Sequence, residues 1–300
     1  MRVAVAGSSG LVGSALVTHL TRRGHDVRRL VRRPAAAPDE IAWSADGAHD
    51  PASLRGLDAV VNVGGAGLGD RRWTPSYRAT ILRSRTAPTG LLARTLADLD
   101  DGPRVFLQAS AVGYYGDRGD EVLTERSGPG NDFLAGVVQA WEAATAPAED
   151  AGIRVAHLRT GILMSRRGGS FGKLLPLLRL GVGGPLGDGR NVWSWITLVD
   201  HARAIEHLLT AEVSGPVNLT GPTPAPQREI IAEIARALHR PAVVRVPRFA
   251  LRLVLGAFAD DVLASQHAVP QVLAESGFVH VHATLPQAAA WVTGRPVPPR

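Results

Sequence analysis

Gly7-Ser8-Ser9-Gly10-Leu11-Val12-Gly13 decides the fold, and it follows a short apolar run, Val3 to Ala6. After the loop, apolar residues recur every three or four positions, which predicts a helix over Val12 to Leu20. Strand, glycine loop and helix in this order are typical of the first turn of a dinucleotide-binding Rossmann fold. Gly7 would permit the tight turn, Gly10 would let a pyrophosphate approach the backbone, and Gly13 would let the helix pack on the strand. We therefore expect cofactor contacts from Gly7, Ser9, Gly10, Leu11, Val12 and Gly13.

Further strand-like runs alternate with helical segments after the glycine loop. The alternative, that the loop is only a glycine-rich turn in an unrelated α/β protein, is therefore less favoured. The strand-like runs are Val27 to Val31, Leu57 to Val63, Val105 to Ala109 and Ile153 to Leu158. Helices are predicted between them, over 74–99 with a break or kink at Pro88, and over 131–151. Strands that alternate with helices predict an α/β fold of the Rossmann type, with a doubly wound parallel sheet.

The composition of the chain changes near residue 160, where we predict a domain boundary. Residues 165–190 are rich in glycine, and only Lys173 to Leu180 forms an apolar run there. We predict a dinucleotide-binding Rossmann domain over 1–160 and a smaller, mixed C-terminal substrate lobe over 161–300. Segments near 192–220 are expected to return to the first domain.

The end of the second predicted strand selects the cofactor. An NAD site needs an acidic residue about 20 positions after the glycine loop, where it binds the ribose 2′-hydroxyl. This chain has Arg32 and Arg33 there, and no acidic residue follows them before Asp39. A guanidinium fork matches a 2′-phosphate, so NADP(H) is the expected cofactor and these two arginines are its expected contacts. The alternative is that both arginines are solvated charges at a strand end.

Later motifs resemble those of the extended short-chain dehydrogenase/reductases. Asn62-Val63-Gly64-Gly65-Ala66 follows the third predicted strand, and Ala109 to Asp117 (ASAVGYYGD) follows the fourth. The finer resemblance covers nearly the whole chain and is to the atypical YfcH-like epimerase subgroup of the NAD-dependent epimerase/dehydratase superfamily. It rests on Arg72-Trp73, Ser84-Arg85, Trp141-Glu142, Leu158-Arg159-Thr160-Gly161, residues 183–189 (GGPLGDG) and Ser194-Trp195-Ile196. Residues 245–293 resemble the small terminal domain of that subgroup, through Val246-Pro247, Ala264-Ser265-Gln266, Pro270 and Gly277-Phe278.

This resemblance implies a Rossmann domain that binds NADP(H) and a C-terminal substrate lobe, without naming a substrate. It also implies that four residues after the third and fourth strands border the cofactor. These are Asn62, Gly64, Gly65 and Ala109.

The sequence departs from this wider family at its acid/base pair, Tyr-x-x-x-Lys, in which the lysine lowers the pKa of the tyrosine. The only lysine of this chain is Lys173, and residue 169 is glycine. Counting back from Trp141-Glu142, the matching helix positions fall near Leu134 and Val138, which are both apolar.

By family analogy, Ser110, Tyr114 and Tyr115 remain near the nicotinamide as catalytic candidates. Tyr115 stands in the Tyr-Gly pair that ends the loop, so we favour it over Tyr114 as a proton donor to the substrate oxygen, with Ser110 holding the same oxygen. The alternative is that the tyrosines line the pocket without transferring a proton, because a phenol with an ordinary pKa needs a specific perturbing group.

Three other patterns could suggest a further activity or site, but each has a simpler structural explanation. Gly168 to Gly172 spells the G-x-S-x-G of a hydrolase nucleophile elbow, but no strand runs directly into its serine. His280 and His282 would share one face of a strand, where an exposed edge is favoured over a metal site. Trp193 and Trp195 would also share a face and either roof a substrate pocket or pack in a core.

Composition excludes several classes of protein. The chain has 300 residues, a formal net charge of +6 and no cysteine, which excludes disulfide scaffolds, thiol catalysis and zinc fingers. No apolar stretch reaches 18 residues and the start shows no leader pattern, so we expect a cytoplasmic protein without a membrane partner. The arginines form no helical stripe and no nucleic-acid motif accompanies them, so the expected partner is a small molecule and not a nucleic acid. No metal is expected, and a homodimer is left open.

The sequence therefore predicts an NADP(H)-binding oxidoreductase or epimerase whose substrate it does not identify. The competing hypothesis is a sensor or scaffold protein that binds the cofactor without turnover, since the usual acid/base pair is missing.

Overall fold

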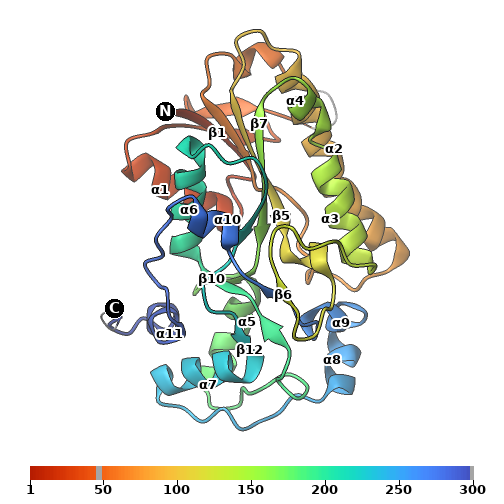
Figure 1. Ribbon diagram of the computed structural model, residues 1–300, viewed down its shortest axis with the longest axis vertical. Helices are drawn as coiled ribbons and strands as arrows, with labels where there is room; N and C mark the ends of the chain where they lie inside the picture. The colour runs from red at the N-terminus through yellow and green to blue at the C-terminus, as the bar shows by residue number, and fades with distance from the viewer. Residues whose placement is uncertain (45–48, 298–300) are drawn as a thin grey trace.

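A seven-stranded parallel sheet forms the centre of the computed structural model, which describes residues 1–44 and 49–297 (Figure 1). Its strand order is β3-β2-β1-β4-β5-β7-β11. β2 and β3 are added on one side of β1, and the strands from β4 onwards are added on its other side, since β4 pairs with the other edge of β1. The predicted doubly wound parallel sheet is therefore confirmed. The strands are β1 (Arg2–Ala6), β2 (Asp26–Val31), β3 (Glu40–Ala42), β4 (Ala59–Asn62), β5 (Val105–Ala111), β7 (Arg154–Thr160) and β11 (Gly215–Leu219).

Helices cover both faces of the sheet because side chains on each strand point alternately to its two sides. In Figure 1, α1 (Leu11–Arg22) and α6 (Leu198–Thr210) lie on one side of the strands. On the other side lie α2 (Pro75–Ala97), α3 (Phe133–Ala143) and α4 (Ala146–Asp150). The first core contains Val3, Val5, Leu16, Leu107 and Leu208, and the second contains Ala4, Val60, Leu92, Leu96 and Phe106.

A smaller lobe lies beyond the carboxyl ends of the strands (Figure 1). Its core joins α5 (Gly169–Arg179), α7 (Gln227–Leu238) and α11 (Leu285–Thr293), and it buries Trp193 and Trp195. Core packing is therefore the correct interpretation of the two tryptophans. The other elements of this part are β8 (Ile162–Met164), β9 (Val192–Trp193), β10 (Trp195–Thr197), β12 (Ala225–Pro226), α8 (Arg248–Leu255), α9 (Phe258–Val262), β13 (His267–Ala268) and α10 (Gln271–Glu275). Short elements of the first 160 residues are η1 (Pro51–Leu54), η2 (Val112–Tyr115) and β6 (Val122–Leu123).

Proline has different effects in the two predicted helices. No break is found at Pro88, which lies inside α2, although this proline lacks the N–H that would bond to the fourth residue before it. The helix predicted over 131–151 is instead divided into α3 and α4. Pro147 cannot continue the hydrogen-bond ladder of α3 and instead occupies the first turn of α4.

Among the described residues, no helix is long and apolar enough to cross a membrane.

Acidification is expected to destabilise this fold through His201, a buried residue of α6 whose Nε2 lies 3.0 Å from Thr160 Oγ1. Burial lowers the pKa of His201 to about 4 from its ordinary value of 6.5. The unfolded chain therefore takes up a proton before the folded chain does, and stability is lost as the pH falls from 6.5 towards 4. We expect a loss of about 2 kcal/mol at pH 5 from this group. Urea unfolding at pH 7.5 and pH 5 measures it, and an equal loss in His201→Gln would refute the assignment.

Candidate cofactor site and adjoining polar cluster

The glycine loop and the loop after β4 touch at the carboxyl ends of their strands. Gly7 has a φ of +76°, and a Cβ atom there would lie 2.7 Å from the backbone N of Gly64. A Cβ atom on Gly13 would lie 2.1 Å from the carbonyl oxygen of Gly7. Only glycine fits these positions without moving backbone, so Gly7 and Gly13 serve the tight turn and the close helix packing that the sequence predicts.

Gly10 is different because the space around its Cβ position is nearly empty. A Cβ atom on Gly10 would meet a single described atom within 4 Å, the carbonyl oxygen of Gly7 at 3.3 Å. α1 begins at the next residue, Leu11, and Gly10 gives it no side-chain cap. The N–H groups of Leu11, Val12 and Gly13 therefore begin a helix with no acidic residue in its first turn. Such a cradle fits the diphosphate of a dinucleotide, because these N–H groups and the helix dipole attract anions.

Asn62, the last residue of β4, supports the loop that follows it. It is buried, and its amide nitrogen donates to Thr89 Oγ1 at 3.1 Å and to Gln108 Oε1 at 2.9 Å. Its amide oxygen accepts from the backbone N–H of Gly64 at 3.2 Å. Asn62 thus holds the loop after β4 in place, while Gly64 and Gly65 form the loop itself.

Arg32 and Arg33, at the end of β2, have different surroundings. Arg33 Nη2 donates to Glu40 Oε1 at 2.7 Å and Arg33 Nη1 donates to Glu40 Oε2 at 2.8 Å. These hydrogen bonds lower the pKa of Glu40. Arg32 is exposed and makes no hydrogen bond or ion pair with any residue in the described parts of the chain. Its guanidinium is therefore available to an anionic ligand, whereas that of Arg33 is already held by a carboxylate.

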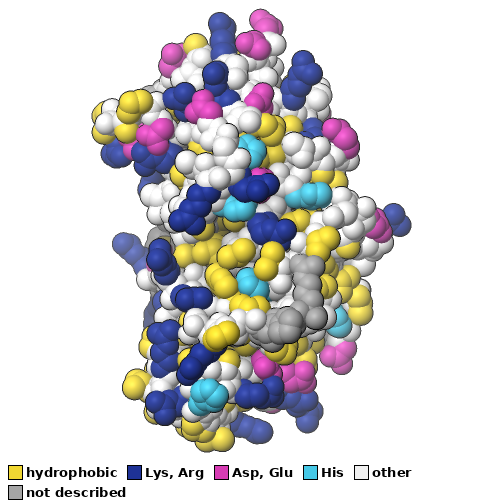
Figure 2. Space-filling model, turned by 90° about the vertical axis from the view of Figure 1, so that its left-hand side faces the viewer, with side chains coloured by type: hydrophobic (Ala, Val, Ile, Leu, Met, Phe, Trp, Pro, Cys, Tyr) yellow, Lys and Arg dark blue, Asp and Glu magenta, His cyan; other side chains and the backbone are white. Residues whose placement is uncertain are grey.

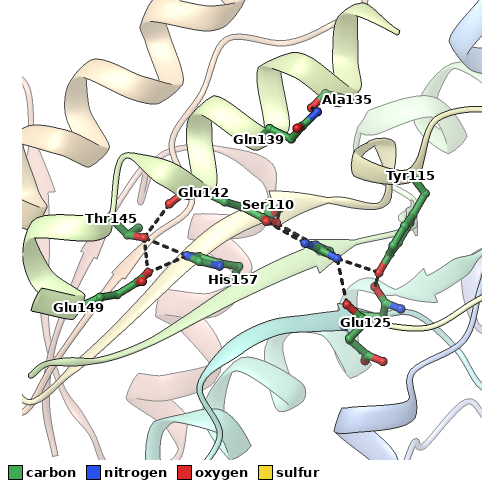
Figure 3. Close-up of polar contacts among 11 residues, drawn as sticks. Ser110, Tyr115, Glu125, Ala135, Gln139, Glu142, Thr145, Glu149 and His157 are labelled. Atoms are coloured by element: carbon green, nitrogen blue, oxygen red, sulfur yellow. Dashed lines mark hydrogen bonds and ion pairs between the residues drawn. The ribbon is translucent and has the colours of Figure 1, made fainter. Parts of the chain in front are cut away.

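A polar cluster joins the ends of β5 and β7 (Figure 3). Arg159 Nε and Nη2 donate to the two carboxylate oxygens of Glu142, both at 2.8 Å. Ser110, opposite Arg159 in the sheet register, donates from Oγ to Glu142 Oε1 at 2.5 Å. Although burial acts in the opposite direction, the Arg159 guanidinium lowers the pKa of Glu142. This bidentate ion pair is almost wholly removed from solvent.

Tyr115 belongs to the same cluster and is fully buried. Its hydroxyl donates to Asn218 Oδ1 at 2.8 Å and accepts from Arg159 Nη1 at 3.1 Å. Burial raises the pKa of Tyr115. These contacts do not fit the predicted donation of a proton from Tyr115 to a substrate oxygen. The Ser110 hydroxyl, committed to Glu142, does not fit its predicted role either.

Tyr114 is the other tyrosine of the loop and is only partly buried. Its ring lies under the Arg159 guanidinium, with 3.4 Å from Cζ to the ring centroid. Among the residues that the structure describes, none makes a hydrogen bond to the Tyr114 hydroxyl. Of the three predicted catalytic side chains, Tyr114 is therefore the one whose hydroxyl is free to meet a ligand. Ala109, one residue before Ser110, is partly buried, and its carbonyl accepts from Gln108 Nε2 at 3.0 Å.

Glu142 and Arg159 belong to motifs that carry the family resemblance, and the sequence does not predict the ion pair between them. A signal was present, because Arg159 is a charged residue in a strand with buried neighbours and such a charge needs a buried partner. The prediction that His280 and His282 lie at an exposed edge is wrong. Both are buried before α11, where His280 Nε2 pairs with the carbonyl oxygen of Thr220 and His282 Nδ1 with Thr197 Oγ1. Across residues 1–44 and 49–297, no three His, Asp or Glu side chains are placed to hold a metal ion.

Comparisons with known proteins show the family and the fold. Residues 3–221 match the NAD dependent epimerase/dehydratase family, and residues 246–292 match a domain of unknown function, DUF1731. The epimerase family protein Mb2239 of Mycobacterium bovis is 41% identical over 297 residues, covering 98% of each chain. The epimerase family protein YfhF of Bacillus subtilis is 33% identical and covers 95% of each. The crystal structure of human epimerase family protein SDR39U1 (isoform 2) with NADPH superposes with a TM-score of 0.91 at 31% identity, covering 98% of this chain and 99% of that one.

Proposed function

This chain belongs to the NAD dependent epimerase/dehydratase family, and from that premise we propose that it binds NADP(H) and acts as an oxidoreductase or epimerase on a small molecule. The observation that carries the proposal is the pair formed by the open cradle at Gly10 and the unpaired guanidinium of Arg32. The first fits a diphosphate and the second fits a 2′-phosphate. That the human relative SDR39U1 was crystallised with NADPH supports the choice of cofactor.

NADP(H) would supply or accept a hydride, and the chain would supply the proton and the substrate contacts. We assign the proton to Tyr114, because its hydroxyl is free and the Arg159 guanidinium covers its ring. Ser110, Glu142 and Tyr115 would hold Arg159 in this position. The lobe over 161–300 would contribute the substrate contacts.

One observation favours the second candidate, a protein that binds NADP(H) without turnover. The hydroxyls of Ser110 and Tyr115 both donate to side chains inside the protein. Neither is therefore free to hold a substrate oxygen beside Tyr114. A panel of carbonyl substrates, followed by NADPH absorbance, separates the two candidates. Tyr114→Phe should lower the rate of any NADPH oxidation in this panel by a factor of roughly 10²–10⁴. Binding without oxidation across the panel favours the second candidate.

Cofactor choice gives a direct test of Arg32. Arg32→Ala should weaken NADPH binding by about 1.5–3 kcal/mol, because one charge-assisted contact is lost, and leave NADH binding nearly unchanged. Isothermal titration of both cofactors measures the ratio. Arg33→Ala is the matched control, since it removes the same charge from a guanidinium that Glu40 already holds. An unchanged NADPH/NADH ratio in Arg32→Ala would refute the assignment.

A further inference from the structure

The stretch over 240–255, which leads into α8 and contains it, combines exposed apolar side chains with positive charge. It includes four arginines and no acidic residue. Its exposed large apolar side chains are Val243, Val244, Phe249, Leu253 and Val254. In Figure 1 the stretch runs along the lower end of the molecule, away from the central sheet. At this end in Figure 2, apolar side chains lie among those of basic residues.

α8 presents its charged and apolar side chains on neighbouring strips of one surface. Phe249 and Leu253 are four residues apart, as are Arg248 and Arg252, so each pair shares one strip of the helix. The exposed fractions of Phe249 and Leu253 are 74% and 71%. Leu251 is the buried residue of this helix, and it packs in a small core with α9. One side of α8 therefore holds it to the lobe, and the amphipathic side is left to solvent.

The exposed apolar surface extends from this stretch to the turn after α5. A Cβ atom on Gly184 would lie 2.2 Å from the carbonyl oxygen of Val244, so the two stretches of backbone touch. Shortly before Gly184, Leu180 and Val182 are exposed as well. Apolar side chains gathered in this way differ from the single exposed ones of an ordinary surface, and they indicate a site of interaction.

Most of the arginines in this stretch have no carboxylate partner. Across residues 1–44 and 49–297, neither Arg245 nor Arg248 makes a hydrogen bond or an ion pair through its side chain. Arg240 donates to a carbonyl oxygen, that of Arg179, at 3.0 Å. Arg252 is the exception, because it pairs with a carboxylate at the surface. The other three guanidiniums can therefore meet anions from outside the chain.

A bilayer that contains anionic lipids matches both properties of this surface. Its phosphates suit the guanidiniums, and its acyl chains, a few ångströms deeper, suit the apolar side chains. A short helix with arginines beside phenylalanine and leucine is typical of segments that lie in a membrane interface. A second copy of this chain fits less well, because it would bring arginines against arginines across the contact.

We propose that this protein binds the surface of anionic membranes through residues 240–255. Phe249 and Leu253 would insert among the acyl chains, while Arg245 and Arg248 would contact lipid phosphates. The proposal goes beyond the NADP(H) function and does not depend on it. The expectation of no membrane partner rests on the lack of a spanning segment, which a contact with the membrane surface does not need.

Sedimentation with lipid vesicles tests the proposal on the full chain. The wild type should bind vesicles of phosphatidylcholine and phosphatidylglycerol, and it should bind them less tightly as the salt concentration rises. Phe249→Ser/Leu253→Ser should weaken this binding roughly 10- to 100-fold, because two exposed apolar anchors are lost. Val122→Ser/Val279→Ser is the matched control and should bind like the wild type, since both valines are exposed outside this surface.

The role of charge has its own pair of variants. Arg245→Gln/Arg248→Gln should weaken binding to the mixed vesicles roughly 10- to 30-fold and reduce its dependence on salt. Arg55→Gln/Arg83→Gln removes the same charge from exposed positions elsewhere and should bind like the wild type. Vesicles of phosphatidylcholine alone should bind the wild type at least about 10-fold more weakly than the mixed vesicles. Equal binding to the two kinds of vesicle would overturn the assignment to anionic lipids.

The chain has no cysteine, so a single introduced cysteine can report insertion at one position. Leu253→Cys labelled with an environment-sensitive fluorophore should shift its emission to the blue when mixed vesicles are added. The same label on Val122→Cys should show no shift. A shift at both positions, or at neither, would overturn insertion through α8.

Failure of the wild type to bind the mixed vesicles would overturn the proposal, as would equal losses in the control variants. Light scattering tests the competing occupant, a second copy of the chain. A dimer that Phe249→Ser/Leu253→Ser abolishes, together with no vesicle binding, would assign the surface to self-association and overturn the membrane contact.

Discussion

Gly10→Val should bind NADPH roughly 100-fold or more weakly while remaining folded. The added side chain would stand where the cradle is open and would keep the diphosphate from the N–H groups of Leu11 and Val12. Losing two charge-assisted contacts of about 1.5–3 kcal/mol each gives at least this factor. The backbone of Gly10 is extended, with φ of −73° and ψ of 174°, so valine adopts it without strain.

Titration calorimetry and circular dichroism together decide this result. Gly128→Val is a suitable control, because Gly128 is exposed, has an ordinary φ and has no described atom within 4 Å of its Cβ position. That variant should bind NADPH like the wild type. A folded Gly10→Val protein with wild-type affinity would show that the diphosphate does not lie over the glycine loop.

Glu142→Ala should lower the free energy of unfolding by about 3–5 kcal/mol, because it leaves the buried charge of Arg159 without a partner. The hydroxyl of Ser110 loses its acceptor at the same time. Urea unfolding measures the change. The double variant Glu142→Met/Arg159→Met should recover most of the loss, since an apolar pair of similar volume often replaces a buried ion pair without net cost.

The exposed pair Arg252 and Asp260 provides the matched control for that experiment. Both side chains are more than half exposed, so Asp260→Ala should change stability by less than about 1 kcal/mol. If Glu142→Ala were no more destabilising than Asp260→Ala, the cluster at the ends of β5 and β7 would not be held by this ion pair. If the double variant were as unstable as the single one, the loss would come from packing and not from an unpaired charge.

The sheet and the cradle could be predicted because they depend on short stretches of sequence. Apolar runs bounded by glycine and proline predict β1, β2, β4 and β5, and the spacing of Gly7, Gly10 and Gly13 predicts the turn that joins β1 to α1. The Cβ positions now show why Gly7 and Gly13 tolerate no side chain, whereas Gly10 faces open space. The short edge strand β3 was missed, because its three residues are too few to show a period.

The sequence alone determined the Rossmann fold, the family resemblance and the two ends of the expected cofactor contact, because glycine sterics and apolar periodicity act between close neighbours in the chain. Only the tertiary structure decided which polar groups are free. Tyr115 is 103 residues from Asn218, its hydrogen-bond partner, and Ser110 is 32 residues from its acceptor, Glu142. Nothing in these spacings shows that either hydroxyl is already bonded inside the protein. Packing brings these partners together, and a polar side chain that finds an internal partner is no longer available to a ligand.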